Sequence, residues 1–211
     1  GIPIILPTKG GSLSDNEVDL GRSAQRFQDA FIVNGVTTGS DQNEKQQIAS
    51  LTSAEIAAAK RISTGFKTFK WNSAVTKKGD SARTHTGVIA QEVRTALEAE
   101  GLDAGNYAFF MSNTFWEKDV EVAAVEAKDA VTRKVIDTDG NEIEEVVTPA
   151  VEARDAFTRT DVYETEDEAP EGATKVTRLG IRYPELLAFV GAATEQRLAN
   201  IETRLAALEA G

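Results

Sequence analysis

The clearest hydrophobic pattern in this chain is a heptad seam close to its C-terminal end. Its positions alternate steps of four and three residues, and they are Leu187, Gly191, Thr194, Leu198, Ile201, Leu205 and Leu208. This spacing is typical of the a and d positions of a coiled coil. Because an isolated helix of this length is marginal in water, we expect residues 184–210 to form a helix that has partners. The pattern also fits a helix packed inside its own chain, and it does not distinguish two strands from three.

Between residues 41 and 80, short apolar patterns change from helical to strand-like spacing. A partial apolar stripe over residues 41–62 predicts a helix, with a second N-cap at Thr52. Aromatic and polar residues alternate over residues 66–71, which predicts a strand. The Lys-Lys-Gly-Asp sequence at residues 77–80 predicts a turn.

The single histidine, His85, precedes another strand-to-helix transition. A short apolar strand follows it, and Val93 and Leu97 then lie on one face of a predicted helix. Gly87 permits a close backbone approach beside His85. His85 is therefore a candidate functional residue, and the alternative is an ordinary strand histidine with a satisfied hydrogen bond.

The first 39 residues contain few long apolar patterns. Residues 1–14 are rich in proline and glycine, which is typical of a surface segment. Residues 27–33 suit a short strand, closed by a turn at Asn34-Gly35. With Leu20-Gly21, Arg26-Phe27 and the closing Gly35, this stretch resembles a segment found near the ends of phage tail fibres, and an ordinary edge hairpin is the alternative.

Residues 117–178 form a distinct acidic segment. They hold 18 acidic and 8 basic residues, a net charge of −10 within a chain of net charge −11. The sequence VEAKDAVTR at residues 125–133 nearly returns as VEARDAFTR at residues 151–159, but two copies are too few for a solenoid. A turn signal around Gly140 predicts a β-hairpin arm whose two limbs fold back there. A solvated, partly disordered loop is the alternative.

Composition narrows the class of partner and of metal site. The excess of 34 acidic over 23 basic residues argues against a nucleic acid or an anionic membrane, and no apolar run is long enough to cross a bilayer. With no cysteine and one histidine, thiolate and multi-histidine metal sites within one chain are excluded. Asp137 and Asp139 lack the closing bidentate glutamate of a calcium loop, so we interpret them as turn residues. We expect no cofactor, and we expect a fragment of a longer protein, because Gly1 rather than methionine opens the chain.

The most reactive arrangement is centred on Ser40. Gly39 precedes it, Asp41 follows it, and Lys45 lies five positions on. The Ser40 hydroxyl is a good N-cap, but it is also placed to attack the Gly39 carbonyl if Lys45 takes its proton. Five residues turn an ideal helix by about 500°, so Ser40 and Lys45 do not share a helix face. The pair therefore requires a bent first turn or a lysine from a neighbouring protomer.

These motifs, taken in order, resemble one family. A Ser-Asp pair with Lys45, an aromatic strand, His-x-Gly-x-x-Ala-Gln-x-Val from His85, and Tyr-Pro-Glu-Leu-Leu from Tyr183 are similar to the intramolecular chaperone auto-processing domain of phage endosialidases, tail spikes and L-shaped tail fibres. The resemblance covers residues 37–116 and 176–211. It departs from the family at Asn43 and Glu44, where arginine and leucine are common, which puts efficient cleavage in question.

The resemblance implies an α+β fold: a small mixed helix and strand body, a long projecting β-hairpin arm at residues 117–178, and a C-terminal helix at residues 184–210 that forms a trimeric coiled coil. Residues 1–39 would be the end of an upstream phage fibre or spike, and residues 40–211 the chaperone. The arm would embrace the upstream β-rich segment of the same polypeptide. The homotrimer would act in the bacterial host cytoplasm on a virion tail precursor, and it would leave after cleavage.

In this interpretation the enzyme is a single-turnover serine endopeptidase that cuts the Gly39–Ser40 bond. Ser40 is the nucleophile and Lys45 the base; Asp41 positions the backbone or compensates charge, and His85 donates to the oxyanion. A permanent trimeric receptor-binding or trimerisation tip without cleavage is the alternative. A plain coiled-coil adaptor explains neither the histidine strand nor the arm.

Overall fold

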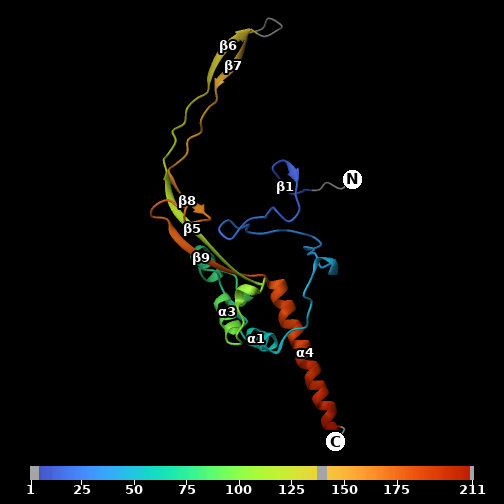
Figure 1. Ribbon diagram of the computed structural model, residues 1–211. Helices are drawn as coiled ribbons and strands as arrows, with labels where there is room; N and C mark the ends of the chain where they lie inside the picture. The colour runs from blue at the N-terminus through green and yellow to red at the C-terminus, as the bar shows by residue number, and fades with distance from the viewer. Residues whose placement is uncertain (1–4, 137–141, 210–211) are drawn as a thin grey trace. The chain divides into compact units, whose positions relative to one another are not determined.

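The computed structural model describes residues 5–136 and 142–209 (Figure 1). Its helices are α1 (Ser53–Ser63), α2 (Asn72–Lys78), α3 (Ala90–Glu98) and α4 (Tyr183–Glu209), with 3₁₀ turns η1 (Gln42–Glu44), η2 (Gly79–Ser81) and η3 (Ala104–Asn106). Its strands are β1 (Thr8–Lys9), β2 (Ser12–Leu13), β3 (Lys67–Phe69), β4 (His85–Gly87), β5 (Phe110–Val122), β6 (Val131–Ile136), β7 (Glu142–Thr148), β8 (Phe157–Tyr163) and β9 (Thr174–Ile181). The chain divides into two compact units, Gly1–Asn113 with Thr177–Gly211, and Thr114–Val176.

The hydrophobic core of the first unit lies where α1, α3 and α4 meet (Figure 1). Leu97 of α3 and Leu186 of α4 are completely buried there, and each such side chain contributes about 1.5–3 kcal/mol relative to exposure. The remaining members of the cluster are Ala58, Ala59, Ile62, Val88, Val93, Ala104, Phe109, Phe110, Phe189 and Ala193. The predicted apolar face of α3, with Val93 and Leu97, is confirmed.

A capping box fixes the start of α1 at Thr52, as the sequence predicts. The Glu55 N–H donates to Thr52 Oγ1 at 3.2 Å, the Thr52 N–H donates to Glu55 Oε2 at 2.6 Å, and the Tyr107 hydroxyl donates to Glu55 Oε1 at 3.1 Å. The Thr52 backbone N–H, which outweighs partial burial, holds the pKa of Glu55 below its ordinary value of 4.5. Burial, together with the bond to Glu55, raises the pKa of Tyr107 above 10.0.

Three local predictions are wrong. Residues 27–33 form no strand, and Asn34-Gly35 is a turn in an exposed segment. The helix predicted over residues 41–62 exists only from Ser53 on, since Ile48 is 68% exposed and its stripe has no surface to pack on. The turn expected at residues 77–80 begins later, because α2 continues to Lys78 and Gly79 then adopts a φ of 54°.

In the second unit, the antiparallel pair β6–β7 has the register Arg133↔Glu145 and Val135↔Ile143. Strand β5 pairs with β8 over seven positions, from Trp116↔Tyr163 to Val122↔Phe157, in a sheet of order β8-β5-β9. The predicted turn at Gly140, with Asp137 and Asp139, lies outside the described residues. Projection of the arm stays a prediction.

The near-repeat pairs with itself. The Val125 N–H donates to the Arg154 carbonyl at 2.8 Å and the Arg154 N–H returns the bond at 2.9 Å; Lys128 and Val151 exchange the same two bonds. Val125 and Val151 open the two copies, so the copies run antiparallel and are related by local pseudo-two-fold symmetry. The repeat therefore encodes a cross-strand pairing.

Helix α4 has two apolar faces. Leu186, Phe189 and Ala193 are buried in the core, as a helix packed inside its own chain would be. The heptad seam lies on other positions and is open to solvent: Leu187 is 52%, Ile201 54% and Leu208 79% exposed. Trimerisation through this seam stays a prediction.

Candidate functional site

The stretch from Gly39 to Lys45 folds back on itself. Residues Gln42–Glu44 form the 3₁₀ turn η1, and Lys45 follows in an extended conformation with its N–H donating to the Gln42 carbonyl at 3.1 Å. This turn brings the Lys45 side chain to Ser40, where Nζ donates to Oγ at 2.7 Å. Of the two arrangements that the sequence leaves open, the pair thus adopts the bent turn within one chain. A nucleophile and a base within hydrogen-bond reach are the geometric requirement for serine activation.

Asp41 holds this turn in place. Its carboxylate Oδ1 accepts from the Asn43 N–H at 2.9 Å and from Asn43 Nδ2 at 3.0 Å. Asp41 is therefore the N-cap of η1, a position that aspartate favours. Asn43, which departs from the family pattern, is the partner of that cap.

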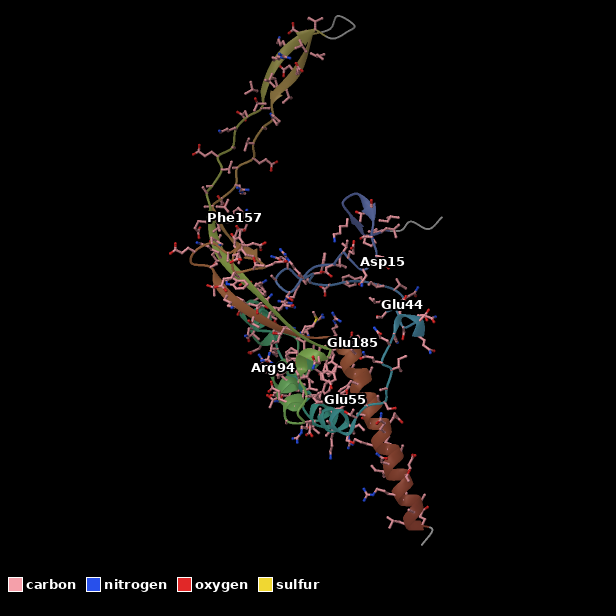
Figure 2. The ribbon with its side chains drawn as sticks, in the orientation of Figure 1. Asp15, Glu44, Glu55, Arg94, Phe157 and Glu185 are labelled. Carbon is pink, nitrogen blue, oxygen red and sulfur yellow. The ribbon has the colours of Figure 1, made fainter. Side chains whose placement is uncertain are left out.

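Glu44, the second residue that differs from the family pattern, lies beside the Gly39–Ser40 peptide bond. Its Oε2 is 3.6 Å from where a Cβ on Gly39 would stand, and Figure 2 labels Glu44 on this turn. A carboxylate here places negative charge next to the carbonyl that Ser40 would attack.

All members of this turn are exposed, including Ser40, Asp41 and Lys45. Solvent therefore reaches both the Ser40 hydroxyl and the Lys45 ammonium group. The pair has the required distance but not the enclosed surroundings.

His85 lies in an aromatic cluster on the β3–β4 pair. Strand β4 is antiparallel to β3 with Phe69 opposite His85, and the two rings stack at 5.8 Å between centroids; the Trp71 ring lies 6.1 Å away. Within the part of the chain that the structure describes, no hydrogen bond joins His85 to Ser40 or Lys45. The oxyanion role of His85 stays a prediction.

The start of α4 contacts the histidine strand. The Val88 N–H donates to the Tyr183 hydroxyl at 3.1 Å, and a Cβ on Gly87 would stand 2.1 Å from that oxygen. Gly87 is thus required by Tyr183. Gly87 and Tyr183 both belong to the sequence motifs quoted above. The sequence does not predict their contact, because the hydrogen bond from Val88 to Tyr183 joins positions 95 residues apart.

Among the described residues, no group of three or more His, Cys, Asp or Glu is arranged to hold a metal ion. No helix in residues 5–136 and 142–209 combines the length and apolarity that a membrane span requires.

Comparison with known proteins places these features in a family. Residues 40–102 match the model of a peptidase family described as "Chaperone of endosialidase". The match begins at Ser40 and includes η1, the β3–β4 pair and α3.

Similar curated proteins belong to bacteriophages. The chain is 30% identical over 204 residues to the probable tail spike protein of Klebsiella phage 0507-KN2-1, covering 94% of this chain and 14% of that protein. It is 37% identical over 89 residues to the capsule K3-specific Depolymerase 1 of Klebsiella phage KP32, covering 42% of this chain and 10% of that protein. The chain therefore spans about a seventh or less of these relatives.

A solved structure has the same fold. It is the carboxy-terminal domain of the bacteriophage T5 L-shaped tail fiber with its intra-molecular chaperone domain, with a TM-score of 0.61 and 23% identity over 92% of this chain and 38% of that chain. The resemblance inferred from the sequence motifs is confirmed: this chain carries a domain of the endosialidase-chaperone family, matched over residues 40–102.

Proposed function

We propose that this chain is the C-terminal intramolecular chaperone of a phage tail fibre or spike, and that it trimerises, assists folding of the upstream segment and then cuts the Gly39–Ser40 bond. The observation that carries the cleavage is the 2.7 Å hydrogen bond from Lys45 Nζ to Ser40 Oγ, at the first residue of the family match. Residues 1–39 are then the end of the upstream protein and residues 40–211 the chaperone.

Trimerisation is supported by the exposed apolar seam of α4. Intertwined β-trimers have many non-local contacts and fold slowly. A helix that trimerises early through local structure raises the effective concentration of the three upstream chains. The β6–β7 limbs of the acidic segment 117–178 are candidates for contact with that upstream segment. Removing the chaperone after folding would trap the product kinetically.

The chemistry follows from the two side chains. Ser40 Oγ attacks the Gly39 carbonyl carbon while Lys45 takes the hydroxyl proton. The Gly39–Ser40 C–N bond breaks, the proton passes to the leaving Ser40 amine, and an ester links Gly39 to Ser40 Oγ. Water then hydrolyses that ester, which releases a Gly39 carboxylate and a chaperone that begins with Ser40. Asp41 keeps η1 in the geometry that brings Lys45 to Ser40.

Because Ser40 and Lys45 are exposed in the single chain, we infer that they become active only after the trimer has assembled. Neighbouring protomers in the trimer would enclose the turn and exclude water from the pair, which would couple cleavage to assembly. The test is the cleavage rate of Lys45→Ala against Lys60→Ala, a matched surface lysine in α1. Loss of cleavage in Lys45→Ala alone is the expected result; equal rates in both variants would exclude Lys45 as the base.

A second candidate function is a permanent trimeric tip of a tail fibre, which does not cleave. The exposed pair and the Glu44 carboxylate beside Gly39 favour it. In this case the second unit would contact a host receptor, and the chain would remain intact in the virion.

A further inference from the structure

The upstream segment contains an ordered turn at residues 21–27. The Arg22 N–H donates to the Gln25 carbonyl at 2.9 Å, and Arg22 Nε donates to Gln25 Oε1 at 2.5 Å. Gly21 has a φ of 78°, and a Cβ there would stand 3.1 Å from the Gln25 carbonyl oxygen and 3.3 Å from the Phe27 ring. The turn closes only because position 21 is glycine.

This turn contacts the body far along the chain. Asn113 Nδ2 donates to Ser23 Oγ at 2.5 Å, and Arg178 donates to the Ser23 carbonyl. Asn113 lies on β5 and Arg178 on β9, which are neighbours in one sheet, and both side chains are half-buried. Two donors from separate strands therefore hold one residue of the upstream segment.

The turn is separated from the Gly39–Ser40 bond by an exposed linker. Ser23 and Ala24 are half-buried, whereas every residue from 25 to 50 is exposed. Neither contact to Ser23 involves a residue of this linker or of the Gly39–Ser40 bond.

We propose that the 21–27 turn is a noncovalent docking element, by which the upstream product stays bound to the chaperone after the backbone is cut. Its partner surface is the β5–β9 pair at Asn113 and Arg178. The proposal rests on the proposed cleavage for its biological setting. Cleavage and release become separate steps, since the bond is cut at η1 while the product is held at Ser23.

The contacts are strong enough to control the release rate. A neutral hydrogen bond is worth on the order of a fivefold change in an equilibrium constant, and one from a charged donor on the order of ten- to a hundredfold. Such effects of interface changes are expressed mostly in the dissociation rate.

The experiment makes the cut without the chain's own chemistry. The full chain with its upstream protein carries Ser40→Ala and a protease recognition sequence inserted between Val36 and Gly39. After a site-specific protease cuts the linker, size-exclusion chromatography over time follows how fast the upstream product separates from the chaperone. A failure of self-cleavage therefore does not affect this measurement.

A matched glycine pair isolates the turn. Gly21→Ala strains the docking turn, whereas Gly35→Ala introduces the same strain, at a φ of 77°, where nothing lies within 4 Å. Asn113→Ala removes a donor from the chaperone side. We expect the cut parent and Gly35→Ala to retain the product, and Gly21→Ala and Asn113→Ala to release it at least about fivefold faster. Immediate release from the cut parent, or equal release rates for Gly21→Ala and Gly35→Ala, would overturn the proposal.

Discussion

Replacing Gly87 with alanine tests how the histidine strand is joined to the start of α4. The new Cβ would stand 2.1 Å from the Tyr183 hydroxyl oxygen and 3.0 Å from its ring carbon Cζ, distances that require the phenol to move. Overpacking of this kind costs about 1–3 kcal/mol. The displaced hydroxyl also leaves the Val88 N–H without its acceptor, and an unsatisfied donor costs about 1–3 kcal/mol. We expect Gly87→Ala to lower the free energy of unfolding by about 2–4 kcal/mol.

A double-mutant cycle separates the contact from general strain. Tyr183→Phe removes the oxygen that the new methyl group meets, so Gly87→Ala is expected to cost less in that background, with a coupling of about 1 kcal/mol or more. The assay is urea unfolding of the full-length protein at one fixed concentration, because oligomerisation shifts apparent stability. Gly180→Ala in β9 is the control, since its Cβ would meet only Met111 at an ordinary 3.7 Å. Strict additivity, or a Gly87→Ala variant as stable as Gly180→Ala, would refute this reasoning.

The remaining predictions concern charge and assembly. The Thr52 N–H lowers the folded-state pKa of Glu55 below 4.5, so the stabilisation from Glu55 is present above pH 4.5 and is lost as the pH falls through the folded value. Urea midpoints of the parent and Glu55→Gln should therefore differ at neutral pH and converge as the pH falls below the folded-state pKa. Glu44→Gln removes a negative charge beside Gly39 and should therefore raise the cleavage rate about fivefold at low salt and by a smaller factor at high salt. A gel assay measures the rate under both conditions, and an unchanged rate would exclude an effect of that charge. Ile201→Asp in the exposed seam should yield monomers by sedimentation and slow cleavage, and a monomer that cleaves at the parent rate would contradict coupling to assembly.

Two features of the fold that depend on neighbouring residues were predicted correctly from the sequence. The cap at Thr52 and the apolar face of α3 depend on residues within a few positions of each other, and both are present as predicted. The helix predicted before Thr52 is absent, since tertiary packing rather than local propensity stabilises most helices. Ile48 has no surface to cover, and Gln47 adopts a φ of 56°.

The faces of α4 illustrate a second limit. The heptad seam dominates its pattern, but the core is built on Leu186, Phe189 and Ala193, which follow a different line of the helix. A helix with apolar residues on two faces does not reveal from its sequence which face its own chain covers. The exposed seam is the face that remains for partners.

In the candidate site, the sequence identified the residues Ser40 and Lys45 but did not predict how their side chains meet. The family motif identified Ser40 and Lys45, whereas ideal helix geometry kept them apart. Only the 3₁₀ turn capped by Asp41 brings their side chains to 2.7 Å. The contacts of Ser23 with Asn113 and Arg178 had no sequence signal, because they join positions 90 and 155 residues apart.

The central claim, a chaperone that cuts itself at Ser40, is tested most directly by intact mass under denaturing conditions. The protein is expressed with its upstream sequence, as the parent and as Ser40→Ala. The account predicts two fragments from the parent, with a new N-terminus at Ser40, and one full-length species from the variant. One intact species from both proteins would contradict the account and would leave the permanent trimeric tip as the function of this chain.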